Sequence, residues 1–154
     1  MAALQNIRAF FALRRFAVVG VSRDSKDFSR LLFHEFVSRG FEPVPVNPDA
    51  SEIEGRKCFA RLGEIQPPVE GALFMTPPAV TDALVCDCPQ AGIQRVWMFR
   101  GAGKGAATPQ AIQYCESHGI QVIPGECPFM FLPHGAWYHR FHGLIRRIAG
   151  SYPG

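Results

Sequence analysis

The sequence predicts an α/β fold in which a doubly wound parallel sheet is covered by helices on both faces. Three observations support this prediction. Short apolar runs of strand length alternate with longer segments of helical character along most of the chain. Glycine or proline stands at many of the boundaries between these segments, where the chain has to turn. The chain has 154 residues, of which 47% are hydrophobic and 19% are charged, and this suits a single domain, residues 1–154, with a complete core.

The first strand and helix, within residues 16–36, are the most informative segment. Ala17, Val18 and Val19 form an unbroken apolar run, which is typical of a parallel strand buried on both faces. Gly20 gives the backbone the freedom to turn sharply where this strand ends. We expect a helix to follow over residues 28–38, with Gly40 as its stop signal.

The turn between this strand and helix carries hydroxyl groups and positive charge. Ser22 and Ser25 supply the hydroxyl groups, and Arg23 and Lys26 supply the charge. They precede the first turn of the expected helix, whose free N–H groups favour an anion. The pattern therefore predicts an anionic ligand at this turn. The alternative is a plain strand-to-helix turn whose cations lie in solvent.

The other expected elements continue the alternation. Pro43 and Pro45 in the second strand suit a strand with irregular edges. The expected strands after the first are residues 42–46, 71–75, 95–99 and 121–124. The expected helices are a leading amphipathic helix in residues 1–15, residues 79–91, residues 108–118 and a terminal helix at residues 137–149. Right-handed crossovers would then give a doubly wound, Rossmann-like sheet.

The ends of four strands are the expected ligand site. In an open parallel sheet the ligand lies beyond the carboxyl ends of the strands, at the point where the strand order reverses. We therefore expect the four ends to line one crevice. They are Gly20-Val21-Ser22, Val46-Asn47-Pro48, Thr76-Pro77-Pro78 and Phe99-Arg100-Gly101.

The end of the second strand argues against a plain NAD site. NAD-binding domains usually have Asp or Glu there for the ribose hydroxyls, whereas this chain has Asn47 followed by Pro48. Ser22 also stands where the dinucleotide fingerprint has its second glycine. A crevice with cations and without that carboxylate suits a ribose that carries an extra phosphate, as in coenzyme A and in NADP. The cations expected nearby are Arg23, Lys26 and Lys57.

Six segments in a fixed order point to a known family. They are GVSRDSKDFSR, PVNP, EIEGRKCF, TPP, RVWM and GECPFMF, and the match that they define runs over about residues 16–132. Together they resemble the small stand-alone CoA-binding proteins, whose fold is similar to that of the CoA-binding domain of the succinyl-CoA synthetase α subunit. The resemblance implies a protein that binds coenzyme A or an acyl-CoA.

The resemblance also implies roles for individual residues. The pyrophosphate would be held by Gly20, Val21, Ser22, Arg23 and Lys26. Asn47 and Pro48 would flank the adenosine ribose. The wall under the pantetheine or adenine portion would be formed by Thr76, Pro77 and Pro78. The phosphorylated histidine of the synthetase lies in a second domain that has no equivalent here, so the resemblance implies binding without ligase chemistry.

The sequence shows no catalytic constellation, and we expect no metal site. The five cysteines are odd in number and lack CxxC spacing, which argues against a disulfide framework. Cys127 follows the fifth strand, and its position motivates the hypothesis that it faces the crevice and forms a mixed disulfide with CoA. The histidines near the carboxyl end suggest either a metal site or, as we favour, a solvated basic helix face. These histidines are His134, His139 and His142.

Composition excludes two classes of partner. The net charge is +3 and the pI is about 8.7, and no stripe of Lys and Arg suggests nucleic-acid binding. No long uncharged run or cleavage pattern suggests a membrane span or a signal peptide, so a cytoplasmic protein is expected. The aromatic-rich residues 129–141 predict either packing against the sheet or a homodimer or partner contact. An NADP-linked or other nucleotide-dependent enzyme and a regulatory interaction protein are the alternatives to CoA binding.

Overall fold

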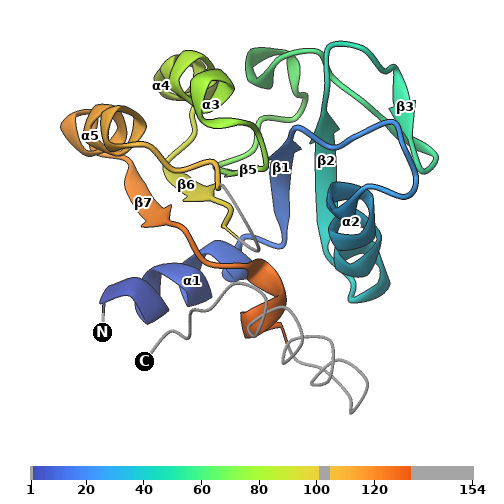
Figure 1. Cartoon of the computed structure of the whole chain (residues 1–154), viewed down its shortest axis with the longest axis horizontal. Coiled ribbons are helices and arrows are strands. Elements are labelled where there is room, and N and C mark those ends of the chain that lie inside the picture. Colours follow the sequence, from blue (N-terminus) through green and yellow to red (C-terminus); the bar gives the residue numbers. More distant parts are fainter. Residues whose placement is uncertain (1, 101–104, 133–154) are drawn as a thin grey trace.

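The computed structural model describes residues 2–100 and 105–132 and contains a five-stranded sheet (Figure 1). All neighbouring strands in this sheet are parallel, in the order β2-β1-β5-β6-β7. The strands are β1 (Arg15–Val19), β2 (Glu42–Val46), β5 (Gly71–Phe74), β6 (Arg95–Met98) and β7 (Gln121–Pro124). The predicted doubly wound, Rossmann-like parallel sheet is therefore confirmed.

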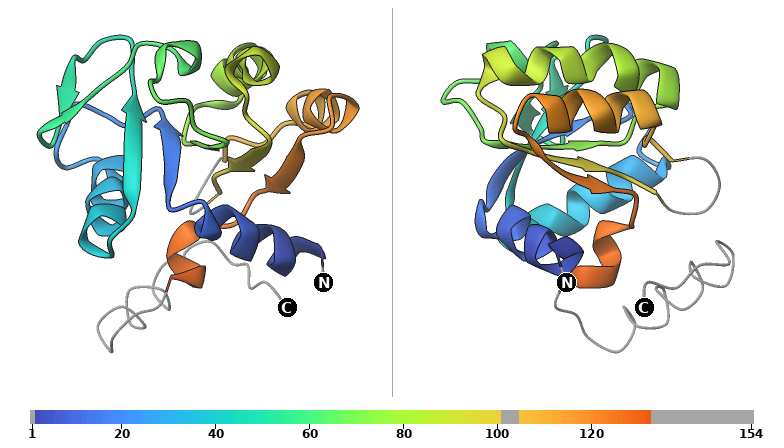
Figure 2. Two further views of the ribbon diagram at one scale, coloured as in Figure 1. Left: turned by 180° about the vertical axis from the view of Figure 1, so that it is seen from behind. Right: turned by 90° about the vertical axis from the view of Figure 1, so that its left-hand side faces the viewer.

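Helices cover both faces of the sheet (Figure 2). One face packs on α1 (Ala2–Ala12), α2 (Phe28–Ser38) and the 3-10 helix η3 (Pro128–Phe131). The other face packs on the 3-10 helix η1 (Leu62–Glu64), α3 (Pro78–Leu84), the 3-10 helix η2 (Val85–Asp87), α4 (Cys88–Ala91) and α5 (Pro109–Ser117). The chain moves from β1 outward to β2 and then crosses to β5 on the other side of β1. The strand order therefore reverses between β1 and β5, which is where open sheets of this kind bind ligands.

Alternate residues of β1 point to opposite faces and build two separate cores. Phe16 and Val18 belong to the core on the α1 and α2 side. Ala17 and Val19 belong to the core on the α3 and α5 side. All four side chains are buried, so both faces of β1, which lies between β2 and β5, are covered.

The prolines of β2 are explained by its position at the edge of the sheet. The Gly20 N–H donates to Val46 O, and the Glu42 N–H donates to Arg14 O, so the even-numbered residues face β1. Pro43 and Pro45 alternate with them and face outward, where a missing N–H costs no bond to β1. The Phe59 N–H donates to the outward-facing Pro45 O at 3.0 Å, and this contact covers part of the edge.

Three expectations about the elements need correction. The leading helix ends at Ala12 rather than at residue 15, because Arg15 already begins β1. The helix expected at residues 79–91 is divided into α3, η2 and α4, and Pro89, which has no N–H, lies in the last piece. A short hairpin, β3 (Glu52–Ile53) with β4 (Arg56–Lys57), was not predicted at all.

Some predictions lie outside the described residues. They concern the terminal helix at residues 137–149, the three histidines His134, His139 and His142, and the part of the aromatic-rich segment after Leu132. Within the described part of that segment, Phe129 and Leu132 are buried in the core beside α1 and α2. These two residues therefore pack inside the molecule rather than form a contact surface.

Candidate functional site

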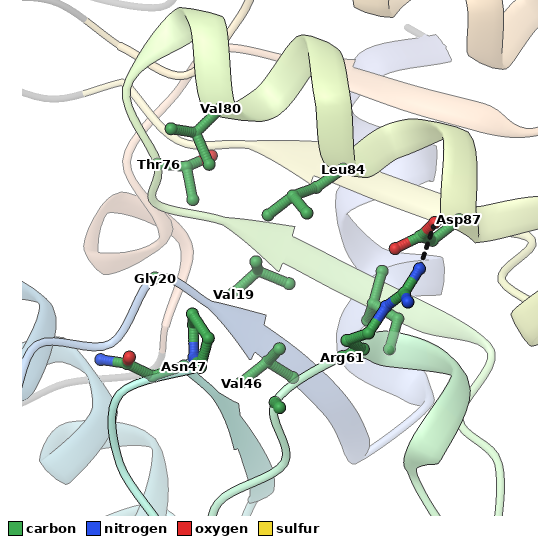
Figure 3. A pocket seen from close by; sticks show the side chains of 12 residues that line it. Val19, Gly20, Val46, Asn47, Arg61, Thr76, Val80, Leu84 and Asp87 are labelled. Atoms are coloured by element: carbon green, nitrogen blue, oxygen red, sulfur yellow. Dashed lines mark hydrogen bonds and ion pairs between the residues drawn. The ribbon is translucent and has the colours of Figure 1, made fainter.

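A cavity of about 360 Å³ lies at the point where the strand order reverses (Figure 3). It is open at the carboxyl ends of β1, β2 and β5 and runs beneath α3. Most of its wall is apolar, formed by Val19, Val46, Pro48, Ala60, Leu62, Val80 and Leu84. Gly20, Asn47 and Thr76 lie at one end, and Arg61 and Asp87 lie at the other. A volume in this range, with few polar groups on apolar walls, is typical of small-molecule sites.

A second hollow, of about 370 Å³, adjoins the first at Thr76. It lies between the start of α2 and the ends of β5 and β6. Its lining consists of Asp27, Phe28, Ser29, Met75, Thr76, Pro77, Pro78, Phe99, Gly105 and Ala106. Because Thr76 lines both hollows, they are neighbouring parts of one crevice over the strand ends.

The structure brings together part of the predicted site. The cavity contains Gly20, Asn47, Pro48 and Thr76, and the second hollow contains Thr76, Pro77 and Pro78. The predicted residues that line neither hollow are Val21, Ser22, Arg23 and Lys26. Val21 is buried in the core on the α1 and α2 side, whereas Arg23 and Lys26 are exposed.

Gly20 is required by the packing of the strand ends. Its φ is +94°, in the region that glycine adopts most readily. A Cβ at this position would lie 2.9 Å from Thr76 Cγ2 and 3.0 Å from the Met75 carbonyl oxygen. A larger residue here would therefore push β1 and β5 apart before it could block any ligand.

The turn after Gly20 is held by its own side chains. The Ser22 N–H donates to Ser29 Oγ at 2.9 Å, and Ser22 Oγ accepts from the Asp24 N–H at 3.0 Å. The Lys26 N–H donates to Asp24 Oδ1 at 2.9 Å. These short-range bonds fix the path of the loop without using the charged groups of Arg23 and Lys26.

Asp27 is a residue that the sequence analysis missed. It is the N-cap of α2, and its Oδ1 accepts from the Ser29 N–H at 2.9 Å and from Ser29 Oγ at 2.7 Å. The chain thus satisfies part of the helix N-terminus with a carboxylate of its own. Within residues 2–100 and 105–132, the N–H groups of Val21, Arg23 and Ser25 have no hydrogen-bond partner. An anion at this turn would therefore meet the loop N–H groups rather than the capped end of α2.

Arg30 holds the loop after β1 through hydrogen bonds to its backbone. Its Nη1 donates to the Arg23 carbonyl oxygen at 3.1 Å and, more weakly, to the Ser22 carbonyl oxygen at 3.4 Å. Its Nε pairs with Glu54 Oε2 at 3.1 Å, and His34 Nδ1 lies 3.0 Å from Glu54 Oε1. The unpredicted β3–β4 hairpin thus supplies the carboxylate that orients Arg30.

Asn47 ties the end of β2 to the loop after β1. Its Nδ2 donates to the Val21 carbonyl oxygen at 2.8 Å, and its Oδ1 accepts from the Asp49 N–H at 2.8 Å. Only an amide can donate and accept in this way, since a carboxylate has no hydrogen to give to Val21. The fold itself therefore favours an amide over an acidic residue at this position, whatever the choice of cofactor.

Thr76 fixes the start of α3. Its Oγ1 lies 2.6 Å from Thr81 Oγ1, and both side chains are buried. Pro77 precedes the helix and Pro78 is its first residue, where a proline ring fits because no N–H is needed. The bond holds the wall of both hollows in place.

Arg61 and Asp87 were not identified from the sequence. Arg61 Nη2 lies 3.5 Å from Asp87 Oδ1, across the end of the cavity (Figure 3). They are 26 positions apart, and neither belongs to a motif that would indicate a site. Lys57, expected near the crevice, instead lies over the Phe59 ring and lines a hollow on the outer edge of β2.

The cysteines are not exposed to the crevice in the way expected. Cys127 is 4% exposed and packs in the core beside α1 and α2, so the expectation that it faces the crevice is wrong. Burial raises the pKa of Cys88, and it raises the pKa of Cys115 to about 11. Both thiols are therefore protonated at neutral pH and are poor nucleophiles.

The described part of the chain shows neither a metal cluster nor a helix suited to the membrane. Residues 2–100 and 105–132 hold no cluster of three or more His, Cys, Asp or Glu side chains suited to a metal ion. In the same ranges no helix has the length and apolar character needed to cross a membrane.

An open parallel sheet with a cavity where the strand order reverses defines the class of Rossmann-like ligand-binding proteins. The chain belongs to the CoA binding domain family, whose model matches residues 14–133. This membership agrees with the resemblance recognised in the sequence.

Individual relatives are similar to this chain over different shares of their own length. The alpha subunit of an ADP-forming acetate–CoA ligase II from Pyrococcus furiosus is 25% identical over 126 residues, which cover 77% of this chain and 27% of that subunit. This chain thus spans about a quarter of that relative's length. A conserved hypothetical protein from Pyrococcus furiosus superposes with a TM-score of 0.64 at 29% identity, over 71% of this chain and 90% of the other. A hypothetical protein from Pyrococcus horikoshii gives a TM-score of 0.74 at 19% identity, over 94% of this chain and 92% of the other.

Proposed function

We propose that this protein binds coenzyme A or an acyl-CoA in the crevice over the strand ends, without catalysing a reaction on it. The observation that carries the proposal is the position of the apolar cavity, which opens at the carboxyl ends of β1, β2 and β5 beside a loop with unpaired cations. Among the described residues, Arg23 and Lys26 form no ion pair. Their charge is therefore available to phosphate groups.

The two hollows suit the two halves of a CoA molecule. The apolar cavity would take the adenine, with the ribose beside Asn47 and Pro48 at its open end. The pyrophosphate would lie against the Gly20-Val21-Ser22 turn, within reach of Arg23 and Lys26. The pantetheine arm would then pass along the second hollow, over Pro77 and Pro78. This arrangement extends the roles that the family resemblance implies.

The chemistry of the lining supports binding rather than catalysis. In the described part of the chain, the ionisable side chains that line the two hollows are Asp27, Arg61 and Asp87. The Asp27 carboxylate caps α2, and Arg61 pairs with Asp87. The one hydroxyl that is paired with a carboxylate among the described lining residues is Ser29 Oγ, which donates to Asp27 Oδ1. Ser29 is buried and its Oγ also accepts from the Ser22 N–H, so this pair serves the start of α2 and the loop rather than a nucleophile free to attack a ligand.

Calorimetric titration tests the proposal directly. The purified protein is titrated with CoA, acetyl-CoA, dephospho-CoA, NADP, NAD and ATP under one set of conditions. We expect CoA to bind best, and we expect dephospho-CoA to bind more weakly because it lacks the ribose phosphate. Tighter binding of NADP than of CoA would support the NADP-linked alternative, and binding of none of these ligands would overturn the proposal.

A further inference from the structure

The end of the cavity away from the Gly20 turn carries a pair of opposite charges. Among the described residues that line this cavity, only Arg61 and Asp87 are charged, and they lie opposite the end formed by Gly20, Asn47 and Thr76 (Figure 3). A nucleotide whose phosphates lie at the Gly20 turn would extend its base toward this pair. The position therefore suits recognition of the base.

The Asp87 carboxylate can accept further hydrogen bonds. Its contact with Arg61 is long, at 3.5 Å, and the carboxylate forms no capping bond to α4. No other hydrogen bond of this carboxylate is formed within residues 2–100 and 105–132. The Asp87 side chain is 27% exposed. Water can therefore supply only part of the hydrogen bonding that a carboxylate oxygen facing the apolar cavity needs. A ligand group that donates a hydrogen bond there would be favoured.

The other polar side chains of the cavity, Asn47 and Thr76, already form hydrogen bonds within the protein. The Asn47 amide bonds to the Val21 carbonyl oxygen and the Asp49 N–H, and the Thr76 hydroxyl bonds to Thr81. They hold the open end in shape. Arg61, by contrast, is 67% exposed, and its guanidinium can adjust to a ligand.

We propose that Asp87 and Arg61 select adenine as the base of the bound nucleotide, an inference that rests on the proposed function. Asp87 accepts a hydrogen bond from the exocyclic amine of adenine, and Arg61 donates to an adjacent ring nitrogen. Adenine presents a donor beside an acceptor, which complements a carboxylate beside a guanidinium. Hypoxanthine presents a keto oxygen in place of the amine, so two acceptors would face each other at Asp87.

The test compares CoA with its hypoxanthine analogue, in which a keto oxygen replaces the adenine amine. Calorimetry on the wild-type protein should show a preference for CoA of about tenfold or more, as expected for one well-placed polar pair. In Asp87→Ala the preference should fall to about twofold or less, because the acceptor is removed. Asp87→Asn should shift the preference toward the analogue, since the amide can donate to the keto oxygen.

The control removes a carboxylate elsewhere. Glu116 is exposed on α5 and lines neither hollow, so Glu116→Ala should keep the wild-type preference. Thermal melting of each variant confirms that the protein is folded. The shift in Asp87→Asn is a result that a merely structural role for this residue would not produce.

The outcomes separate this inference from the proposed function. Equal binding of CoA and the analogue by the wild-type protein, or an unchanged preference in Asp87→Ala, would overturn the inference and leave CoA binding intact. Failure of the wild-type protein to bind either molecule would overturn the proposed function itself.

Discussion

The face of the sheet that packs on α1 and α2 is filled with aromatic rings, whereas the face under α3 keeps an open cavity at the strand ends. On the first face Phe16 packs against Phe10 at 4.9 Å and Phe36 at 5.0 Å between ring centroids, and Phe10 meets Trp97 edge-on at 5.5 Å. All these side chains are fully buried. The comparison indicates a division of labour, in which one face supplies stability and the other supplies space for a ligand.

Residue size explains the difference. Large aromatic side chains bury much area and pack edge to face, so they fill the middle of the first face. The hollow on that side is confined to the strand ends beside the start of α2. On the second face the strands carry mostly smaller side chains, such as Ala17, Val19, Val46 and Ala72. Small aliphatic side chains leave room beneath α3, and the cavity occupies it. This division can be tested by changing one face at a time.

The largest expected effect follows removal of an aromatic ring from the first face. Phe16→Ala should lower the free energy of unfolding by about 3–5 kcal/mol, because a fully buried ring is replaced by a void. Urea denaturation measures this loss. If the variant is too unstable to purify, Phe16→Leu should show a smaller loss in the same direction. The affinity of the folded protein for CoA should stay within about threefold of wild type, a change of less than 1 kcal/mol.

The matched control lies on the other face. Val80 is 40% exposed and lines the cavity, so Val80→Ala should change the free energy of unfolding by at most about 0.5 kcal/mol. Equal losses of stability in Phe16→Ala and Val80→Ala would contradict the division of labour between the faces.

A pair of leucine-to-tryptophan substitutions sharpens the comparison. Leu32 is fully buried on α2, and Leu32→Trp should destabilise the protein by about 1–3 kcal/mol because no space is available for the larger ring. Leu84 on α3 lines the cavity, and Leu84→Trp has space to occupy. We expect Leu84→Trp to lower CoA affinity by about tenfold or more, that is by at least about 1.4 kcal/mol, with a smaller loss of stability than Leu32→Trp. Urea denaturation and calorimetry measure the two quantities. A Leu84→Trp protein that binds CoA as wild type does would show that the ligand lies elsewhere.

Regular elements could be predicted from local patterns. The bounds predicted for α2, β2 and β7 match the structure, because apolar periodicity, Gly40 and the edge prolines are signals carried by neighbouring residues. The break before α4 could also have been recognised, since Pro89 lies inside the helix expected at residues 79–91. The crevice was predicted in outline from the rule for strand ends.

The rest of the site depends on partners far apart in the chain. Arg30 meets Glu54 over 24 positions, and Arg61 meets Asp87 over 26. No local pattern indicates such pairs, because the fold alone brings them together. The roles of Gly20 and Asn47 in holding β1 against β5 and β2 are likewise visible only in three dimensions.

A charge reversal in the loop after β1 tests which side of the crevice holds the phosphates. Lys26→Glu should weaken CoA binding by about 1–3 kcal/mol, since a charge-assisted hydrogen bond is lost and a like charge is introduced. Stability should change little because Lys26 is exposed. The loss should shrink in high salt.

The matched control is the same reversal at Lys57. This exposed lysine lies over Phe59 and lines the hollow on the outer edge of β2, away from the cavity. Lys57→Glu should keep CoA affinity within about twofold, a change of about 0.4 kcal/mol. Equal losses in both variants would indicate a general effect of net charge rather than a phosphate site at the loop.

The smallest expected effect concerns Asn47, at the open end of the cavity. Asn47→Asp keeps the size of the side chain and the acceptor for the Asp49 N–H, but it removes the donor to the Val21 carbonyl oxygen. We expect a loss of about 1 kcal/mol in the free energy of unfolding, as for one hydrogen bond, measured by urea denaturation. The same variant separates two explanations of why an amide stands at position 47. If the amide serves the fold, Asn47→Asp should lose stability and gain no affinity for NAD. If its main effect were to exclude NAD, stability would be unchanged and NAD binding would appear in calorimetry.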